Sequence, residues 1–223
     1  MIREFSADEF WFLLQSVRWT ALLAMLAFLG GGTGGLLVAV ARVAPFRPTR
    51  IGAAVLIKIL QGLPLLILLF LVYFGANLFG IRTDAWLAAV IGLTLYASVF
   101  LGEIWRGCIE AVPAGQWDAA SALALGFGQR LRLVIGPQAA RIAIAPTVGF
   151  MVQLLKSTSL ASILGFTELT RAAQLVNNAT FRPLIVFSIV AGLYFALCWP
   201  LSLLSLWVER RLRRRGPAGQ ARA

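Results

Sequence analysis

The chain has 223 residues, of which 60% are hydrophobic, and its mean hydropathy is +0.84. This hydropathy is too high for a water-soluble domain and is typical of an integral membrane protein. The formal net charge is +11, but the basic residues gather between apolar runs that are long enough to cross a bilayer. We therefore predict a multi-pass membrane protein that binds the lipid bilayer and no nucleic acid.

The N-terminal segment predicts two helices in succession. Ser6 and Glu9 have the spacing of a capping box, so we expect a short helix over about 7–18 that lies on the membrane surface. A charge-free run then predicts the first span near 19–41, which is not a signal peptide because acidic rather than basic residues precede it. Its GGGTGG sequence, at 30–35, favours close helix packing over a hinge.

The second span, near 52–79, contains the sequence QGLPLL. Pro64 has no amide proton, and its ring presses against the carbonyl of Leu60. Two interpretations are open at this point. The span is either a continuous helix with a proline kink, or a discontinuous helix whose freed backbone groups face a ligand.

The third span, near 85–107, ends with Glu103 and Arg106 on one helix face. This spacing favours a structural ion pair over a conformational latch. Cys108 and Cys198 are isolated, and the sequence contains no histidine, so neither a disulfide nor a metal site is expected.

A polar, helix-forming stretch follows at 113–126. Pro113 suits the first turn of a helix, Asp118 brings a negative charge early in it, and Gly126 and Gly128 offer a stop. The residues between are strong helix formers. Such a helix lies either in a groove of a soluble partner or on the lipid headgroups.

The fourth and fifth spans are expected near 138–164 and 183–209, followed by a basic tail at 210–223 that anchors the chain and meets anionic lipid. Lys156 interrupts the fourth span about 21 Å along its helix, in the outer half of the bilayer. An ionisable residue there is by default a functional-site hypothesis, and snorkelling to the interface is the alternative. Thr158 and Ser159 place hydroxyl groups beside it.

Counting basic residues in alternate loops separates the two faces of the membrane. Five Lys or Arg residues fall on one face, in 1–18, 80–84 and 165–182, and fourteen fall on the other, in 42–58, 103–141 and 209–223. The positive-inside rule predicts that the second face is cytoplasmic. The N-terminus is then outside, and the helix at 113–126 is in the cytoplasm with the C-terminus.

Several segments together resemble one family. The run from Asp118-Ala119-Ala120 through Gly126 to Ile135-x-Pro137 resembles the EAA motif of bacterial ABC importer permeases. The wider string EIWRGCIEAVPAGQWDAASALALG…GPQAAR…LLKSTSLASILGFTELT is similar to the polar amino-acid subfamily, the histidine/glutamine/glutamate/arginine type. The resemblance runs from about Leu13 to Arg211.

This resemblance implies an all-α permease core of five transmembrane helices with a cytoplasmic coupling helix, in the bacterial inner membrane. Its partners would be an ABC ATPase dimer that binds ATP and Mg, a second permease subunit, and an extracytoplasmic amino-acid-binding protein. The helix at 113–126 would be the coupling helix seated on the ATPase. Its contact residues would be Pro113, Gly115, Gln116, Asp118, Ala119, Ala120, Ala122, Leu123 and Gly126.

The chain departs from the family pattern in four places. Asp118 replaces the first glutamate of the motif and keeps its charge, whereas Gly136 replaces a leucine and predicts looser packing. The second-span pattern Arg-Gly-Thr-Pro begins here with Gln61, which removes a cation. The fourth-span pattern Lys-Asp-Thr-Ser has Ser157 in place of its acid.

If this chain binds the substrate, we expect Lys156 to hold the α-carboxylate, with hydrogen bonds from Thr158, Ser159 and Gln61. The carbonyl of Leu60 would accept from the α-ammonium. This site requires the second helix to begin near Thr49, so that Gln61 reaches mid-membrane. Alternatively, the partner permease carries the site. The sequence does not distinguish an identical from a related partner, nor does it identify the amino acid.

The sequence contains no phosphate-binding GxxxxGK[ST] loop and no nucleophile–base pair, so we predict a non-catalytic subunit. Two other functions are open. An ATP-independent carrier or channel would need mid-span carboxylates or an inverted repeat, and neither is found in the sequence. A non-transporting membrane scaffold would use the helix at 113–126 to bind a soluble regulator.

Overall fold

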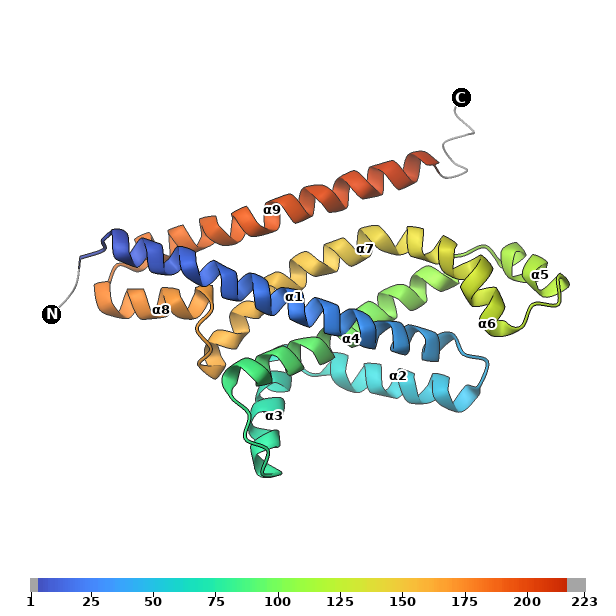
Figure 1. Ribbon diagram of the computed structural model, residues 1–223, viewed down its shortest axis with the longest axis horizontal. Helices are drawn as coiled ribbons and strands as arrows, with labels where there is room; N and C mark the ends of the chain where they lie inside the picture. The colour runs from blue at the N-terminus through green and yellow to red at the C-terminus, as the bar shows by residue number, and fades with distance from the viewer. Residues whose placement is uncertain (1–3, 216–223) are drawn as a thin grey trace.

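The computed structural model describes residues 4–215, and its regular elements are all helical (Figure 1). In chain order they are α1 (Ala7–Val43), α2 (Arg47–Gly62), α3 (Leu65–Leu78), α4 (Ala85–Glu110), α5 (Ala114–Ala122), α6 (Phe127–Gln129), a π-helical turn η1 (Arg130–Ile135), α7 (Gly136–Ser157), a 3₁₀ segment η2 (Thr158–Leu164), α8 (Leu169–Thr180) and α9 (Pro183–Arg215). The predicted all-helical fold class is confirmed. Of the basic tail at 210–223, residues 216–223 lie outside the described part.

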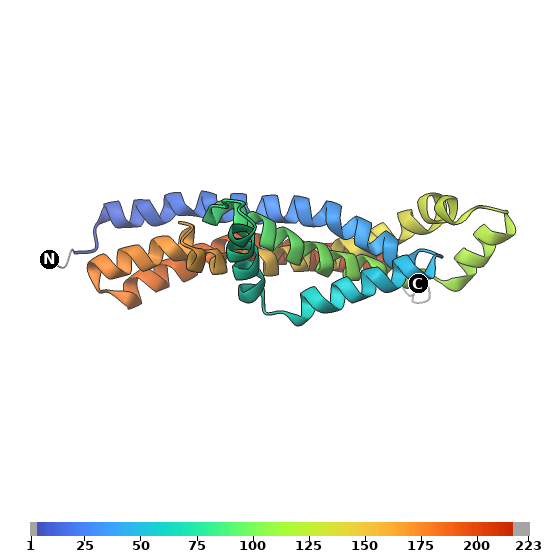
Figure 2. The same cartoon turned by 90° about the horizontal axis from the view of Figure 1, so that it is seen from below.

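Four stretches are long and apolar enough to cross a membrane: α1, α4, α9 over Pro183–Arg211, and the run Phe127–Leu164. The pair α2 and α3 makes a fifth if it is taken as one bent span. The long helices run side by side along one axis, and α3 stands across them (Figures 1 and 2). The expected five crossings agree with this arrangement.

The surface helix expected over 7–18 is not a separate element. The capping box does form, because the Ser6 amide donates to the Glu9 carboxylate at 3.0 Å and the Asp8 amide donates to Ser6 Oγ at 3.3 Å. The helix that it starts continues without a break to Val43. No helix-breaking residue separates the two predicted pieces, and buried Leu13 holds the first turns against α8 and α9.

Glycines of α1 bring its backbone against α4. A Cβ atom built on Gly31 or Gly34 would overlap Ala97 or Ser98 of α4, and one on Gly35 would lie 2.9 Å from Leu101 Cβ. Gly102 of α4 has the same role, because a Cβ atom built on it would overlap Val38 of α1. The predicted close packing at 30–35 is therefore confirmed, and α4 is its partner.

The second span is broken rather than kinked. α2 ends at Gly62, α3 begins at Leu65, and their axes differ by 102°. Leu63 and Pro64 have extended backbone conformations, with ψ of 134° and 135°, so the helical hydrogen-bond ladder stops between them. This resolves the alternative left open by Pro64 in favour of a discontinuous helix.

A buried carboxylate at the end of the molecule near the N-terminus joins three helices. Glu168 is fully buried, and it caps α8 by accepting from the Arg171 amide at 2.9 Å. Its other oxygen accepts from Tyr194 of α9 at 3.0 Å and from Thr20 of α1 at 3.4 Å. The Leu169 amide in turn donates to Thr20 Oγ1 at 3.1 Å. No sequence pattern predicted this junction, because Glu168 lies in a connecting segment.

We predict that Gly31→Ala destabilises the chain, whereas Gly32→Ala does not. The new methyl group at position 31 would lie 2.3 Å from Ala97 Cβ and 3.2 Å from the α4 backbone, and such overpacking costs about 1–3 kcal/mol. At position 32 the nearest atom, on Trp105, is 3.8 Å away. Thermal unfolding of the purified variants would measure the difference, and equal midpoints for the two would contradict the packing described here.

A second prediction concerns pH. Burial raises the pKa of Glu168 above its usual range. The hydrogen bonds to Glu168 lower its pKa, but the effect of burial is larger. The unfolded chain therefore loses this proton first as the pH rises. The stability contributed by Glu168 is full below the ordinary glutamate pKa and is lost as the pH passes the raised value.

As the pH rises above the ordinary glutamate pKa, the unfolding temperature of the wild type should therefore fall relative to that of Glu168→Gln, which cannot titrate. Glu4→Gln, an exposed change, serves as the control and should follow the wild type. Parallel pH profiles for the wild type and Glu168→Gln would show that folding does not change the pKa of this carboxyl group, and would contradict the prediction.

Candidate functional site

The helix α5 lies at the end of the molecule opposite the N-terminus, beyond the long helices (Figure 1). Most of its residues are exposed. Of the nine residues expected to contact an ATPase, eight are exposed, namely Pro113, Gly115, Gln116, Asp118, Ala119, Ala122, Leu123 and Gly126. Ala120 is buried, so it faces the permease itself rather than a partner.

Aromatic and apolar contacts hold α5 to the helical body. Val112 is buried in a cluster with Ile109 of α4 and Ile135 of η1, and Trp117 packs against the same cluster. The Trp117 ring also stacks on Phe127, with centroids 6.5 Å apart. These contacts join α5 to the end of α4 and to the η1 turn before α7.

Two side-chain hydrogen bonds add to this attachment. Gln138 of α7 donates to Gln116 Oε1 at 3.1 Å, and Arg130 of η1 donates to Ser121 Oγ at 2.7 Å. Both tie α5 to the helix that follows it. The N-terminus of α5 has no side-chain cap, because Pro113 precedes it.

The end of α5 differs from the expected one. The helix stops at Ala122 because Ala124 adopts a left-handed conformation with φ of 56°. The Ala124 amide then bonds to the Ser121 carbonyl at 2.9 Å, and the Leu125 amide to the Ala120 carbonyl at 3.4 Å. This is a Schellman motif with alanine at the position where glycine is usual. Rules that look for glycine at the end of a helix therefore do not predict it. Gly126, predicted as a stop, instead precedes α6.

Two further expectations for this segment are corrected. Asp118 lies in the second turn of α5, so its carboxylate is too far from the helix N-terminus for a dipole role. It forms no hydrogen bond or ion pair within residues 4–215 and is available to a partner. Gly136 is a tight position rather than a loose one, since a Cβ atom there would lie 2.5 Å from the Leu131 carbonyl oxygen. The π-helical turn η1 brings that carbonyl close.

A chain of ion pairs braces the base of this segment. The Glu103 carboxylate forms ion pairs with the Arg106 guanidinium at 2.6 Å and with that of Arg42 of α1 at 3.6 Å. Arg106 also pairs with Glu110. The expected pair of Glu103 and Arg106 therefore forms, and it belongs to a larger group that joins α1 to α4. A static brace between α1 and α4 fits this geometry.

The residues expected to hold a substrate come from three elements, α2, α7 and η2, all of which contribute to the main core. Leu60 of α2 and Leu160 of η2 pack against the same cluster of buried residues. Gln61 and Lys156 are exposed, and neither side chain forms a hydrogen bond or ion pair within residues 4–215. α2 begins at Arg47, so Gln61 lies about 21 Å along it, as the site requires.

The two hydroxyl groups are less free than expected. Thr158 is fully buried, and its Oγ1 donates to the Leu155 carbonyl at 2.7 Å. Ser159 Oγ donates to the Lys156 carbonyl at 2.8 Å. Hydroxyl groups near the end of a helix often bond backward to its carbonyls. Both protons are therefore used within the chain, and of the four polar side chains only Gln61 and Lys156 have unengaged donors.

Sequence reasoning missed Lys58, which was counted with a cytoplasmic loop. It lies in α2, about 17 Å from the start of that helix, so it is inside the bent span. Arg47, Arg50, Lys58 and Gln61 fall within one arc of about 80° on α2, by the helical period of 3.6 residues. A polar stripe along a membrane helix is the signal that would have found it.

A hollow of about 770 Å³ between α1, α4 and α7 is not suited to a polar substrate. Its lining includes Phe28, Leu36, Trp105, Ile109 and Ile144 and is almost entirely apolar. Polar ligands need hydrogen-bonding groups, so Gln61 and Lys156, whose donors are unengaged, remain the better candidates.

The comparisons with known proteins agree on one family. Residues 31–214 match the model of the family described as "Binding-protein-dependent transport system inner membrane component". The chain is 32% identical to the probable amino-acid ABC transporter permease protein YckA of Bacillus subtilis (strain 168), covering 86% of this chain and 84% of that protein. It is 35% identical to the L-cystine transport system permease protein TcyB of the same organism, with coverages of 93% and 89%.

Solved structures show the same likeness. The crystal structure of an amino acid ABC transporter with histidines has a chain that matches with a TM-score of 0.83 and 32% identity, over 90% of this chain and 94% of that one. A chain of the inward-facing MetNI methionine ABC transporter matches with a TM-score of 0.76 at 18% identity, over 93% of this chain and 99% of that one. The second match shows the fold alone.

Proposed function

Because this chain belongs to the family of inner membrane components of binding-protein-dependent transport systems, we propose that it carries a polar amino acid and is driven through α5 by a separate ATPase. The chain is a multi-pass inner membrane protein and the non-catalytic translocation subunit of an ATP-driven amino-acid importer. This assignment replaces the two alternatives, an ATP-independent carrier and a membrane scaffold.

The observation that carries the proposal is the exposed, terminal position of α5. A short helix on which seven of the nine residues are exposed suits a groove on a soluble partner better than the lipid surface, since its residues form no apolar stripe. ATP binding would draw the ATPase dimer together, and α5 would pass that movement to α4 and α7 through Val112 and Trp117. ATP and Mg would stay on the partner.

The orientation follows from the charge distribution. We infer that the α5 end is cytoplasmic, because Arg42, Arg50, Arg130 and Arg132 gather near it. The N-terminus of α1 and the helix α8 then lie outside, where an amino-acid-binding protein would deliver the substrate. A second permease subunit would complete the path.

For the substrate we infer a carboxylate held by Lys156, with a hydrogen bond from Gln61. The exposed Lys58 adds a second positive charge on the same helix as Gln61. None of the nine acidic residues lies on α2, α3 or α7. A path with two lysines and no carboxylate disfavours amino acids with cationic side chains, because like charges repel strongly where water is scarce.

To test the coupling, we predict that Ala119→Glu abolishes co-purification with the ATPase and ATP-driven uptake. The added carboxylate would have to be buried in an apolar contact, and a tenfold or greater loss of affinity, about 1.4 kcal/mol or more, is expected. Asn178→Glu puts the same charge on exposed α8 at the other end and serves as the control.

Both variants should insert in the membrane in equal amounts. Normal uptake by Ala119→Glu would refute the role of α5, and equal losses in the two variants would point to a general effect of the added charge.

To test the substrate site, we predict that Lys156→Ala weakens amino-acid binding to the assembled transporter at least tenfold, about 1.4 kcal/mol, whereas Lys156→Arg keeps most of it. Arginine should compete with bound glutamine or glutamate more weakly in the wild type than in Lys58→Ala. Unchanged affinity in Lys156→Ala would assign the site to the partner permease, and strong competition by arginine in the wild type would contradict the charge argument.

A further inference from the structure

Two hollows lie next to each other on the side of the helical body toward α5. The larger, of about 770 Å³, lies between α1, α4 and α7, and the smaller, of about 370 Å³, is lined by the ends of α1 and α4 together with residues of α2, α5 and α6. Ile109 of α4 lines both hollows. On α1, Val40 lines the larger hollow, whereas Arg42 and Val43 line the smaller. The two hollows therefore suit one elongated ligand that has an apolar part and a polar part.

The wall of the larger hollow suits an apolar ligand. Its hydroxyl and indole groups are already bonded within the chain, because the Trp105 indole N–H donates to Thr147 Oγ1 at 2.9 Å and Thr33 Oγ1 donates to the carbonyl of Gly30 at 2.8 Å. The wall also carries large apolar side chains that are 58%, 56% and 43% exposed, namely Leu29, Leu36 and Ile144. An acyl chain that enters sideways from the bilayer meets both conditions.

The depth of the larger hollow in the bilayer follows from its position on α1. Trp19 packs edge to face on Trp86 with ring centroids 6.1 Å apart, and such aromatic groups mark the membrane–water interface. Arg42 lies about 35 Å further along the helix, just beyond a hydrocarbon core of roughly 30 Å. Phe28 and Val40 lie about 14 Å and about 32 Å from Trp19. The larger hollow therefore spans the leaflet next to Arg42, and the smaller one lies at the level of the lipid headgroups.

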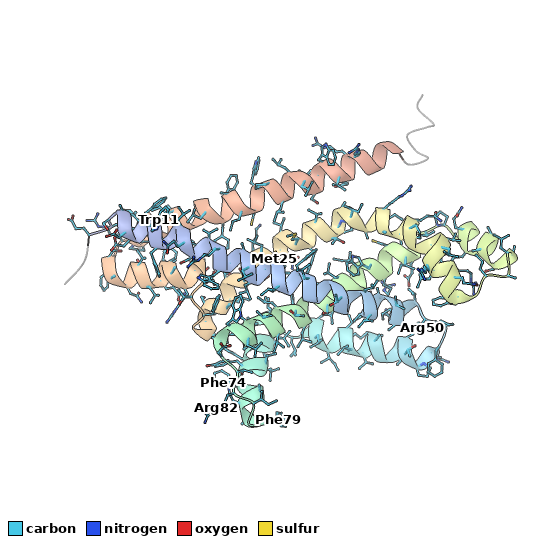
Figure 3. All side chains as sticks on the ribbon, in the orientation of Figure 1. Trp11, Met25, Arg50, Phe74, Phe79 and Arg82 are labelled. Carbon is cyan, nitrogen blue, oxygen red and sulfur yellow. The ribbon has the colours of Figure 1, made fainter. Side chains whose placement is uncertain are left out.

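Two arginines line the smaller hollow. Figure 3 shows Arg50 at the end of α2 that lies toward α5, and its side chain forms no hydrogen bond or ion pair within residues 4–215. The Nε atom of Arg42 is buried and lies 3.6 Å from Glu103, which is too far for a hydrogen bond. Glu110, which also lines this hollow, is paired with Arg106. Guanidinium groups with unused donors suit a phosphate group, which they bind through parallel hydrogen bonds.

We propose that the two hollows together bind one phospholipid with an anionic headgroup. One acyl chain fills the larger hollow, and the phosphate group lies between Arg42 and Arg50 in the smaller. The second acyl chain stays in the bilayer, because the larger hollow is open on the side of its exposed residues. The arginines select an anionic lipid, since the charge of a zwitterionic headgroup is balanced by its own ammonium group.

The headgroup lies where α5 joins the helical body. Val112 and Trp117, which attach α5 to α4 and η1, also line the smaller hollow. A bound phosphate group therefore links the end of α1 and the start of α2 to this attachment, and ATP-driven uptake should depend on anionic lipid. Lipid binding itself requires neither ATP nor the proposed amino-acid substrate, so it is measured separately from the proposed function.

The test measures lipid retention by the complete transporter, purified from nanodiscs of phosphatidylcholine with about a quarter phosphatidylglycerol. Native mass spectrometry counts the lipids of each kind that stay bound, without ATP or substrate. Arg50→Gln should retain phosphatidylglycerol about fivefold less than the wild type, the effect of one arginine at a membrane surface. Arg47→Gln removes the same charge one turn earlier on α2, outside both hollows, and should retain it as the wild type does.

A second variant tests the larger hollow. Gly32 lines it, and a Cβ atom built there has Trp105 as its nearest neighbour, at 3.8 Å. Gly32→Leu should therefore fill the space of the acyl chain and release the bound phosphatidylglycerol. Gly192→Leu makes the same change on α9, where a Cβ atom meets no other atom within 4 Å, and serves as the control.

Equal losses in Arg50→Gln and Arg47→Gln would show a general attraction to the basic surface and would overturn the proposal. Retention of phosphatidylglycerol by Gly32→Leu would overturn it as well, and so would equal retention of the two lipids by the wild type. Release of the lipid by inorganic phosphate would assign the arginines to a free anion. Uptake is measured on the same preparations: bound lipid without uptake supports the lipid site and counts against the proposed function, whereas full uptake without bound lipid overturns the lipid site alone.

Discussion

The absence of side chains on one face of α1 is the constraint on which the architecture depends. With hydrogen at Gly31, Gly34 and Gly35, the backbones of α1 and α4 meet, and no larger residue fits between them. In a bilayer, water does not drive helices together, so close contact of this kind has to supply the attraction. α4 carries the ion-paired base of α5, and α1 carries the buried junction with α8 and α9. Both ends of the molecule are therefore positioned by this one contact.

The sequence predicted the fold well where a signal is local and strong. Apolar runs located the spans, the GGGTGG sequence indicated close packing, and Pro64 marked the point where the second span breaks. It did not reveal that α1 continues through the predicted surface helix, because continuity depends on tertiary contacts of Leu13 with α8 and α9. Helix limits in general follow such contacts rather than propensity.

The candidate site was predicted less completely than the fold. The location of α5 was right to within a few residues, but its end depends on Ala124, whose left-handed conformation no propensity rule assigns to alanine. Gly136 looked loose because a π-helical turn cannot be read from composition. Lys58 was missed because it was counted with the basic loop at 42–58, although the predicted span near 52–79 already contains it. The engagement of Thr158 and Ser159 by backbone carbonyls depends on the three-dimensional structure and has no signal in the sequence.

The short length of α5 has a consequence for how the transporter is built. Nine residues without a side-chain cap are too few to sustain a helix by themselves in water, and only Ala120 is buried by the permease. The ATPase would therefore complete the folding of this segment as well as receive it. Subunit assembly then acts as a checkpoint, because an orphan permease would present a marginal cytoplasmic tip to proteases while a paired one would conceal it.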